Sequence, residues 1–243
     1  MPQILLVIVG AILGKLTEKL FEAFAKRRQR QFATSIAGPE DVSAWKWNGV
    51  KLLTKLIELD KRLIGDSLTD SREGTAKQWA SIFVHHPHSW ALLVNGPKHI
   101  VGYWHFAPLR DEVFAKAKSG DLLDSEILFD TVETLDVPGH YNLYFVLIGI
   151  LPEHQVGFGK LIDEFFSRIE SLAERGIFFR EVCANAFTRQ GKRLCEGFGM
   201  EKVCDHHEFG VVYLTALAPW PHALRHKRWE NLAEMYEREF GPA

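Results

Sequence analysis

The first feature of this sequence that could do chemistry is a glycine turn between an apolar segment and an amphipathic one. Residues 141–151 are almost all apolar, as expected of a strand that is buried on both faces. Gly157 and Gly159 follow shortly, and residues 160–175 have helical periodicity. Glycine has no Cβ, so backbone N–H groups can converge on an anion at the positive end of the helix dipole. This order predicts a phosphate-binding site, although similar turns also occur in proteins that bind no ligand.

Composition and motifs exclude several kinds of site. The sequence contains no GxxxxGK[ST], and the third glycine of GxGxxG is missing, which disfavours nucleoside triphosphates and dinucleotides. The net charge of −2 disfavours nucleic acid as a partner. Cys183, Cys195 and Cys204 show no CxxC spacing, so we expect neither a disulfide framework nor a zinc site, and we expect no other metal. The cysteine usage indicates a reducing, cytoplasmic compartment.

The glycine turn must be positioned by the helices and strands around it, and these alternate along the sequence. Two helices are predicted over 49–64 and 73–84, and two strands over 89–94 and 100–106. The strands are separated by Asn-Gly-Pro-Lys, which is typical of a hairpin. The remaining elements are the expected strands 177–183, 201–204 and 209–217 and the expected helix 189–196. This pattern indicates an α/β protein.

Two motifs in this order resemble those of the GNAT superfamily of acyl-CoA-dependent N-acyltransferases. ILPEHQVGFGKLI at 150–162 is similar to the family's strand, R/QxxGxG/A turn and helix, which grip the CoA pyrophosphate. GKRLCEGFGM at 191–200 is similar to its AxxLYExxGF helix. The resemblance covers about residues 51–217. It implies a GNAT-like mixed, mostly antiparallel sheet flanked by helices, with acetyl-CoA as the acyl donor. The acceptor would be a primary amine of unknown identity, on a small molecule or a protein.

The resemblance also implies which residues bind the cofactor. The central strand would splay from its neighbour beside a bulge, where its backbone would pair with pantetheine, and the turn would hold the pyrophosphate. The R/Q position falls on His154, with Gln155 one residue later as the other candidate. The family's asparagine position falls on Thr188, with Asn185 as the nearby substitute. The implied residues are Ile148, Gly149, Ile150, His154, Gln155, Val156, Gly157, Phe158, Gly159, Lys160, Asn185 and Thr188.

The reaction that the resemblance implies needs a proton donor and a general base, and the sequence offers candidates for both roles. Cys195 stands where the family has a tyrosine that protonates the departing CoA sulfur; the alternative is a small buried residue in a helix. Glu133 is the first candidate for the general base, followed by Asp136 and His140, because they precede the central strand. Each could equally be an exposed loop charge. Residues 108–140 form an acidic insert, which would favour a cationic amine if it roofs the acceptor site.

Both ends of the chain lie outside the resemblance. Residues 4–30 predict one helix, apolar at first and then amphipathic, with a basic end. This helix could span a membrane from the cytoplasmic side, lie in its inner face, or pack against a second copy of the chain. Residues 33–39 predict a linker and 218–243 a helical tail with a basic run, so the divisions are 1–38, 39–217 and 218–243. The alternative function is a non-catalytic CoA-binding or scaffold module that this helix tethers to a membrane or an oligomer.

Overall fold

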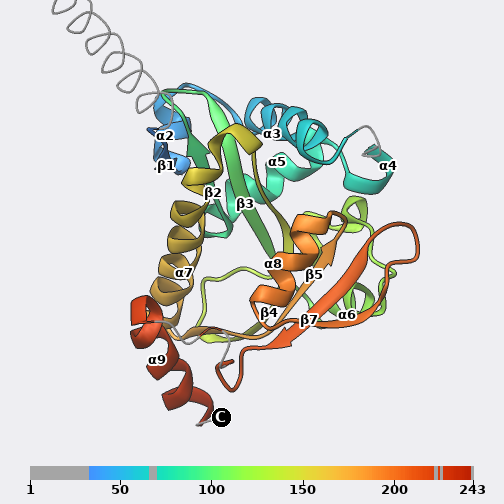
Figure 1. Cartoon of the computed structure of the whole chain (residues 1–243), viewed down its shortest axis with the longest axis vertical. Helices are drawn as coiled ribbons and strands as arrows, with labels where there is room; N and C mark the ends of the chain where they lie inside the picture. Colours follow the sequence, from blue (N-terminus) through green and yellow to red (C-terminus); the bar gives the residue numbers. More distant parts are fainter. Residues whose placement is uncertain (1–32, 66–69, 222–223, 225–226, 242–243) are drawn as a thin grey trace, which may run out of the picture.

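A twisted mixed sheet forms the centre of the protein (Figure 1). The computed structural model describes residues 33–65, 70–221, 224 and 227–241. In this part of the chain the sheet has seven strands in the order β1-β2-β3-β4-β5-β7-β6, and only β4 and β5 pair in parallel. The expected mixed, mostly antiparallel sheet flanked by helices is therefore confirmed. The strands are β1 (Ser35–Ala37), β2 (Trp90–Val94), β3 (Ile100–Leu109), β4 (Gly139–Ile150), β5 (Ile177–Ala186), β6 (Glu201–Asp205) and β7 (Val211–Ala216).

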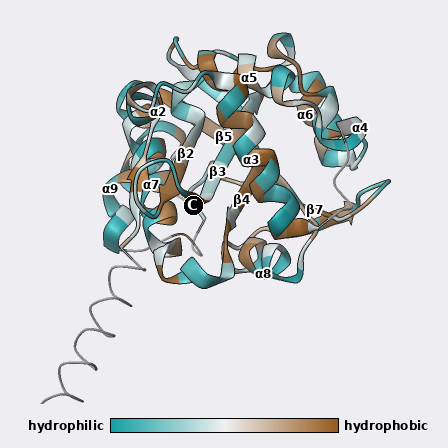
Figure 2. Cartoon of the chain, turned by 90° about the horizontal axis from the view of Figure 1, so that it is seen from above, coloured by the Kyte–Doolittle hydropathy of each residue, from teal (hydrophilic) through white to brown (hydrophobic). Residues whose placement is uncertain are grey.

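Amphipathic helices cover both faces of this sheet. Helix α3 packs on β3 and β4 together with α5, and α7 packs on the opposite side against β2 and β5. Polar and apolar residues alternate along α3 and α7 (Figure 2), which is the pattern of helices with one buried side. The helices are α2 (Pro39–Ala44), α3 (Gly49–Ile64), α4 (Asp70–Glu73), α5 (Ala76–His85), α6 (Asp111–Ser119), α7 (Phe158–Glu174), α8 (Arg189–Gly197) and α9 (Glu230–Phe240).

Strands β4 and β5 diverge halfway along their length. Their pairing ends at Phe145 and Ala184, although β4 stays paired with β3 as far as Ile150. A bulge lies at the point of divergence, because Phe145 and Leu147 pair with consecutive residues of β3 and Val146 has no partner there. The prediction of a strand buried on both faces is right for residues 142–144 and wrong for 145–150, which are only half-buried. The divergence exposes one edge of β4.

The segment expected to be a linker belongs partly to the sheet. Residues Ser35–Ala37 form β1, which pairs antiparallel with β2, and helix α2 begins at Pro39. The linker prediction for 33–39 is therefore wrong. A three-residue edge strand is too short to show the alternation that identifies strands in a sequence. The predicted helix over residues 4–30 lies outside the described residues. No helix in the described part of the chain is long and apolar enough to cross a membrane.

The tail and the acidic insert both pack on the sheet domain. In the tail, Trp229 stacks on Phe166 of α7 at 3.8 Å between ring centroids, and the buried Tyr236 hydroxyl accepts a hydrogen bond from Phe179 N at 3.0 Å. Of the basic run, Arg228 pairs with Asp163 at 2.9 Å, whereas residues 222, 225 and 226 lie outside the described residues. The insert contains α6 and two 3₁₀ turns, Asp124–Glu126 and Phe129–Thr131. The division at residues 38 and 217 stays a prediction.

Candidate functional site

The divergence of β4 and β5 opens a cleft of about 640 Å³. One wall is β4 from Phe145 to Ile150, and the other is β5 from Ala184 with the start of α8. Backbone groups on these strand edges have lost their ladder partners, so an extended ligand can pair with them as an added strand would. Eight predicted site residues line this cleft. They are Ile148, Gly149, Ile150, Gln155, Phe158, Asn185, Thr188 and Cys195.

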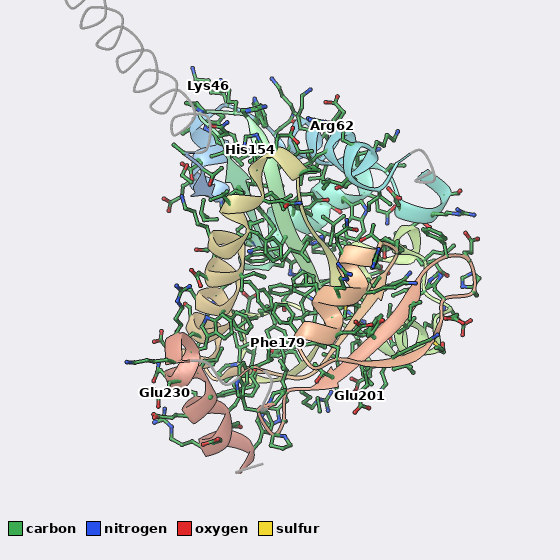
Figure 3. The ribbon with its side chains drawn as sticks, viewed as in Figure 1. Lys46, Arg62, His154, Phe179, Glu201 and Glu230 are labelled. Atoms are coloured by element: carbon green, nitrogen blue, oxygen red, sulfur yellow. The ribbon has the colours of Figure 1, made fainter. Side chains whose placement is uncertain are left out.

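The charges lining the cleft are all positive. Arg62 of α3 and Arg193 of α8 line it, and no acidic side chain among the described residues does so. Arg62 lies 3.4 Å from Glu153 in an exposed pair, which water weakens. Figure 3 shows Arg62 at the same end of the molecule as His154, where the chain enters α7. This end of the cleft therefore favours an anionic ligand.

The predicted glycine turn differs in shape from an open loop. Residues Pro152–Gly157 form a 3₁₀ helix that continues directly into α7. Gly157 has φ −79° and ψ −8°, values that any residue adopts. Its lack of a Cβ serves packing, because an added Cβ would lie 2.7 Å from Leu93 Cδ2 and 2.8 Å from Thr34 Oγ1. At Gly159, by contrast, a Cβ would meet open space.

The structure distinguishes the two candidates for the R/Q position. Gln155 lines the cleft, whereas His154 is buried and faces the His99 ring. The Lys160 ammonium donates to the carbonyl of Thr34 beside β1. Five predicted residues are thus not among those lining the cleft: His154, Val156, Gly157, Gly159 and Lys160. Because each turn of the 3₁₀ helix brings only every third side chain to one face, Gln155 and Phe158 share the cleft side.

The two candidates for the asparagine position, Thr188 and Asn185, have different roles in the structure. Thr188 is the N-cap of α8, where its hydroxyl accepts from Gly191 N at 3.0 Å. Asn185 donates to Phe209 O at 3.1 Å, and its buried Oδ1 has no hydrogen-bond partner among the described residues. Both line the cleft. Asn185 therefore retains a free acceptor oxygen beside it.

Cys195 lies on the buried side of α8 at the end of the cleft. It is 7% exposed, and burial raises the pKa of its thiol to about 11. It also borders a wholly apolar cavity of about 70 Å³ between α7 and α8. A protonated thiol at this place is a weak proton donor.

A second, smaller cavity adjoins the cleft at β4, beneath α3 and α5. It has a volume of about 50 Å³ and is lined mainly by apolar side chains, among them Leu53, Trp79 and Phe83. Its polar members include the acids Asp60, Glu73 and Asp124 and the imidazole of His105. No lysine or arginine of the described chain lines it. The cavity therefore has negative potential and walls of low polarity.

Burial keeps the two aspartates of this cavity weakly acidic. The Tyr103 hydroxyl donates to Asp60 Oδ2 at 2.7 Å, and the Tyr144 hydroxyl donates to Asp124 Oδ1 at 3.0 Å. Desolvation raises the pKa of each carboxyl to about 7 against this hydrogen bonding, and Asp124 raises that of Asp60 further. The fully buried Tyr103 and Tyr144 have their own pKa raised well above the usual value by burial and by the adjacent aspartate. Both aspartates can therefore exchange a proton near neutral pH.

The structure does not bring Glu133, Asp136 and His140 into either cavity. Glu133 follows the bridge between Leu109 and Val132, and its amide donates to Pro108 O at 2.7 Å. His140 pairs with Glu239 of α9 at 2.7 Å. These residues lie by the first residues of β4, whereas the bulge lies near Val146, several residues further along the strand.

The cleft and the acidic cavity meet at the bulge. Four residues line both: Ile64, Val146, Leu147 and Phe187. The side chains that the cleft and the acidic cavity share are thus all apolar and lie around the diverging strand.

Sequence reasoning missed Asp60 and His105, although each leaves a signal. Asp60 follows Leu56 by four residues and Leu53 by seven, so a charged residue lies on the apolar stripe of α3. His105 interrupts the apolar strand 100–106. Asp124 was expected only as one of the many acids of the insert, and no pattern distinguishes it from them. No group of three or more His, Cys, Asp or Glu side chains able to hold a metal ion occurs in the described part of the chain.

Comparison with known proteins finds similarity in structure alone. No family model matches the sequence. No curated protein matches it either. Among solved structures, a GNAT-family acetyltransferase from Staphylococcus aureus has 10% identity and a TM-score of 0.47 over 76% of this chain and 99% of that one. An acetyltransferase from Thermus thermophilus has 17% identity and a TM-score of 0.42 over 77% and 99%. A GNAT-family N-acetyltransferase from Escherichia coli, in complex with CoA, has 14% identity and a TM-score of 0.41 over 76% and 81%.

The sheet has the features that the resemblance of the two motifs implies. The sheet is mixed and mostly antiparallel, its single parallel pair in the described chain is β4 and β5, and these strands diverge beside a bulge.

Proposed function

We propose that this protein is an N-acetyltransferase that moves an acetyl group from acetyl-CoA to a primary amine. The observation that carries the proposal is the meeting, at the β4 bulge, of a cleft lined by arginines with a cavity lined by carboxyls. Phosphates need cationic or N–H partners, and an amine needs a base. The two adjoining spaces supply these groups.

The cleft fits acetyl-CoA in chemistry as well as in shape. Free backbone groups of Ile148, Gly149 and Ile150 suit the amides of pantetheine, which pair as a strand does. Arg62, Arg193 and Gln155 suit the phosphates at the end of the cleft where α7 begins. When bound, acetyl-CoA would supply the thioester carbon that the amine attacks.

Asp124 is the residue best placed to act as general base. It takes one proton from the ammonium form of the acceptor, whose neutral nitrogen then forms a bond to the thioester carbon while the bond from that carbon to sulfur breaks. The departing thiolate takes a proton from the Cys195 thiol or from water, and the second proton, which the nitrogen loses as the amide forms, restores that donor. Asp60 remains beside the amine as a second carboxyl, and its negative charge favours a cationic acceptor.

Binding of acetyl-CoA tests the donor half of the proposal. Arg193 lines the cleft. Arg189 is exposed on the same helix and does not line the cleft, so Arg193→Gln and Arg189→Gln are matched variants. By calorimetry, we expect Arg193→Gln to weaken acetyl-CoA binding three- to tenfold, and Arg189→Gln to leave it unchanged. ATP and NAD serve as control ligands. Equal effects of the two variants would place the phosphates elsewhere.

Turnover separates the proposal from its alternative. The tight 3₁₀ form of the glycine turn and the loss of the family's tyrosine favour a non-catalytic CoA-binding module. An N-acetyltransferase releases CoA from acetyl-CoA only when an amine is present, which a thiol reagent detects. Binding of acetyl-CoA without amine-dependent release of CoA would support the module.

A further inference from the structure

The acidic cavity has hydrogen-bond acceptors that the protein itself leaves unused. Asp60 is 8% exposed, and its Oδ1 is buried without a partner in the described part of the chain. His105 is 2% exposed, and its Nε2 is likewise unpartnered. Unsatisfied buried polar groups are costly, so two of them on residues that line one cavity indicate a ligand that completes them.

The missing partner is a donor that carries positive charge. The pKa of His105 is lowered to about 3 by burial, so the ring is neutral and can accept a hydrogen bond. Contacts with Trp79 at 5.2 Å and Phe83 at 4.3 Å between ring centroids fix its position. Asp60, Asp124 and Glu73 add carboxyl groups, and no basic side chain of the described chain lines the cavity beside them. A primary amino group has up to three N–H donors and suits this arrangement.

The rest of the cavity wall indicates that the acceptor is apolar beyond its amino group. Leu53, Ile57, Trp79 and Phe83 form an apolar surface under α3 and α5. With a volume of about 50 Å³, the cavity takes the amino group and the first carbons of the acceptor, and the rest of the carbon chain extends beyond it. A peptide backbone or a second charge placed against these side chains would lose its hydration without gaining a partner.

The space beyond the first cavity continues its apolar wall. A neighbouring cavity of about 40 Å³ shares Asp124, Glu73 and Phe187 with the first and is lined by Leu122, Leu123 and Phe209. Its further carboxylate, Glu208, pairs with Arg72 at 2.5 Å, so the charges of these two residues offset each other. A carbon chain that leaves Asp124 in this direction meets apolar side chains and this ion pair.

We propose that the acceptor is a compact primary monoamine with an apolar body, bound with its amino group at Asp60, Asp124 and His105. This inference rests on the proposed function and narrows its acceptor. It excludes diamines and peptide N-termini as preferred substrates. Asp60 is then a residue that binds the amine, distinct from the base Asp124.

Two ligands of equal shape test this proposal. Pentylamine and putrescine differ only in one end group, CH₃ against NH₃⁺. Each is titrated by calorimetry into the wild-type protein saturated with CoA, so that no turnover is needed, and an alanyl peptide serves as a third ligand. We expect pentylamine to bind at least tenfold more tightly than putrescine or the peptide. Equal or tighter binding of putrescine or the peptide would overturn the proposal.

Variants then locate the amine. We expect Asp60→Asn to weaken pentylamine binding at least tenfold while acetyl-CoA binding stays unchanged. Ile57→Glu places a carboxylate on the apolar wall and should reduce the preference for pentylamine over putrescine about tenfold. Val50→Glu, at an exposed position of the same helix, should leave that preference unchanged. An unchanged pentylamine affinity in Asp60→Asn would overturn the proposal.

Failure of this inference is distinguishable from failure of the proposed function. If acetyl-CoA binds and some amine is acetylated, but pentylamine does not bind, the monoamine inference is wrong and the function stands. If acetyl-CoA itself does not bind, both are wrong.

Discussion

Replacing Asp60 with asparagine should make the protein more stable at alkaline pH. The carboxyl is buried, one oxygen accepts from Tyr103 at 2.7 Å, and the other has no partner in the described structure. Burial raises its pKa from 3.8 to about 7. The folded state therefore holds the proton more tightly than the unfolded chain does. This stabilising effect is complete below pH 3.8 and is lost as the pH rises through about 7.

The size of the effect follows from the shift in pKa. One pKa unit corresponds to about 1.4 kcal/mol, so the ionised carboxyl costs the fold about 4 kcal/mol above pH 7. About 2 kcal/mol of this cost is already present near pH 5, where the unfolded chain is ionised. The substituted asparagine cannot ionise, and its amide oxygen can still accept from Tyr103. We therefore expect Asp60→Asn to gain about 2–3 kcal/mol on the wild type between about pH 5 and pH 9.

Urea unfolding at the two pH values measures this gain. Glu58→Gln is the matched control, because Glu58 lies on the same helix with an exposed side chain beside Lys55. Its effect on the free energy of unfolding should be small and equal at both pH values. If the free energy of unfolding of Asp60→Asn also differed from that of the wild type by the same amount at both pH values, the claim that ionisation of Asp60 destabilises the fold would be refuted.

Three further predictions concern catalysis and the glycine turn. The wild-type rate should rise as the pH passes about 7, where Asp124 loses its proton, and Asp124→Asn should lower kcat/KM about 100-fold and abolish this rise. An unchanged pH–rate profile would remove Asp124 from the mechanism. Cys195→Ala should lower kcat about tenfold in steady-state assays with the KM for acetyl-CoA unchanged, whereas an unaffected kcat would leave Cys195 a packing residue. In urea unfolding, Gly157→Ala should lose about 1–3 kcal/mol by crowding Leu93, while Gly159→Ala in open space should be neutral or gain up to about 1 kcal/mol. Equal losses would contradict the packing role of Gly157.

The sequence predicts the elements of the sheet domain well because their signals are local. The helix at 49–64 and the strands around the Asn95–Gly96 turn depend on periodicity and turn chemistry, and the structure has them within a few residues. The divergence of β4 and β5 is not visible in periodicity and was implied only by the resemblance. Its consequence for residues 145–150, which are half-buried, was therefore missed.

The acidic cavity could not be assembled from the sequence. Asp60 lies on α3, His105 on β3 and Asp124 in the insert, so only the tertiary fold brings them together. Glu133 was expected at the site because it precedes β4 in the chain, but a strand of twelve residues separates its two ends widely. Proximity in sequence to a strand does not tell which end of it carries the chemistry. The short strand β1 was missed for the different reason that three residues cannot show a period.

Hydrogen exchange with and without acetyl-CoA tests the central claim most directly. If pantetheine pairs with the diverging strand edges, acetyl-CoA should slow exchange in peptides that cover residues 145–151 and 184–188. It should leave α9 (Glu230–Phe240) unchanged, because that helix lies away from the cleft. Binding of acetyl-CoA without protection of the two strand segments would contradict the account.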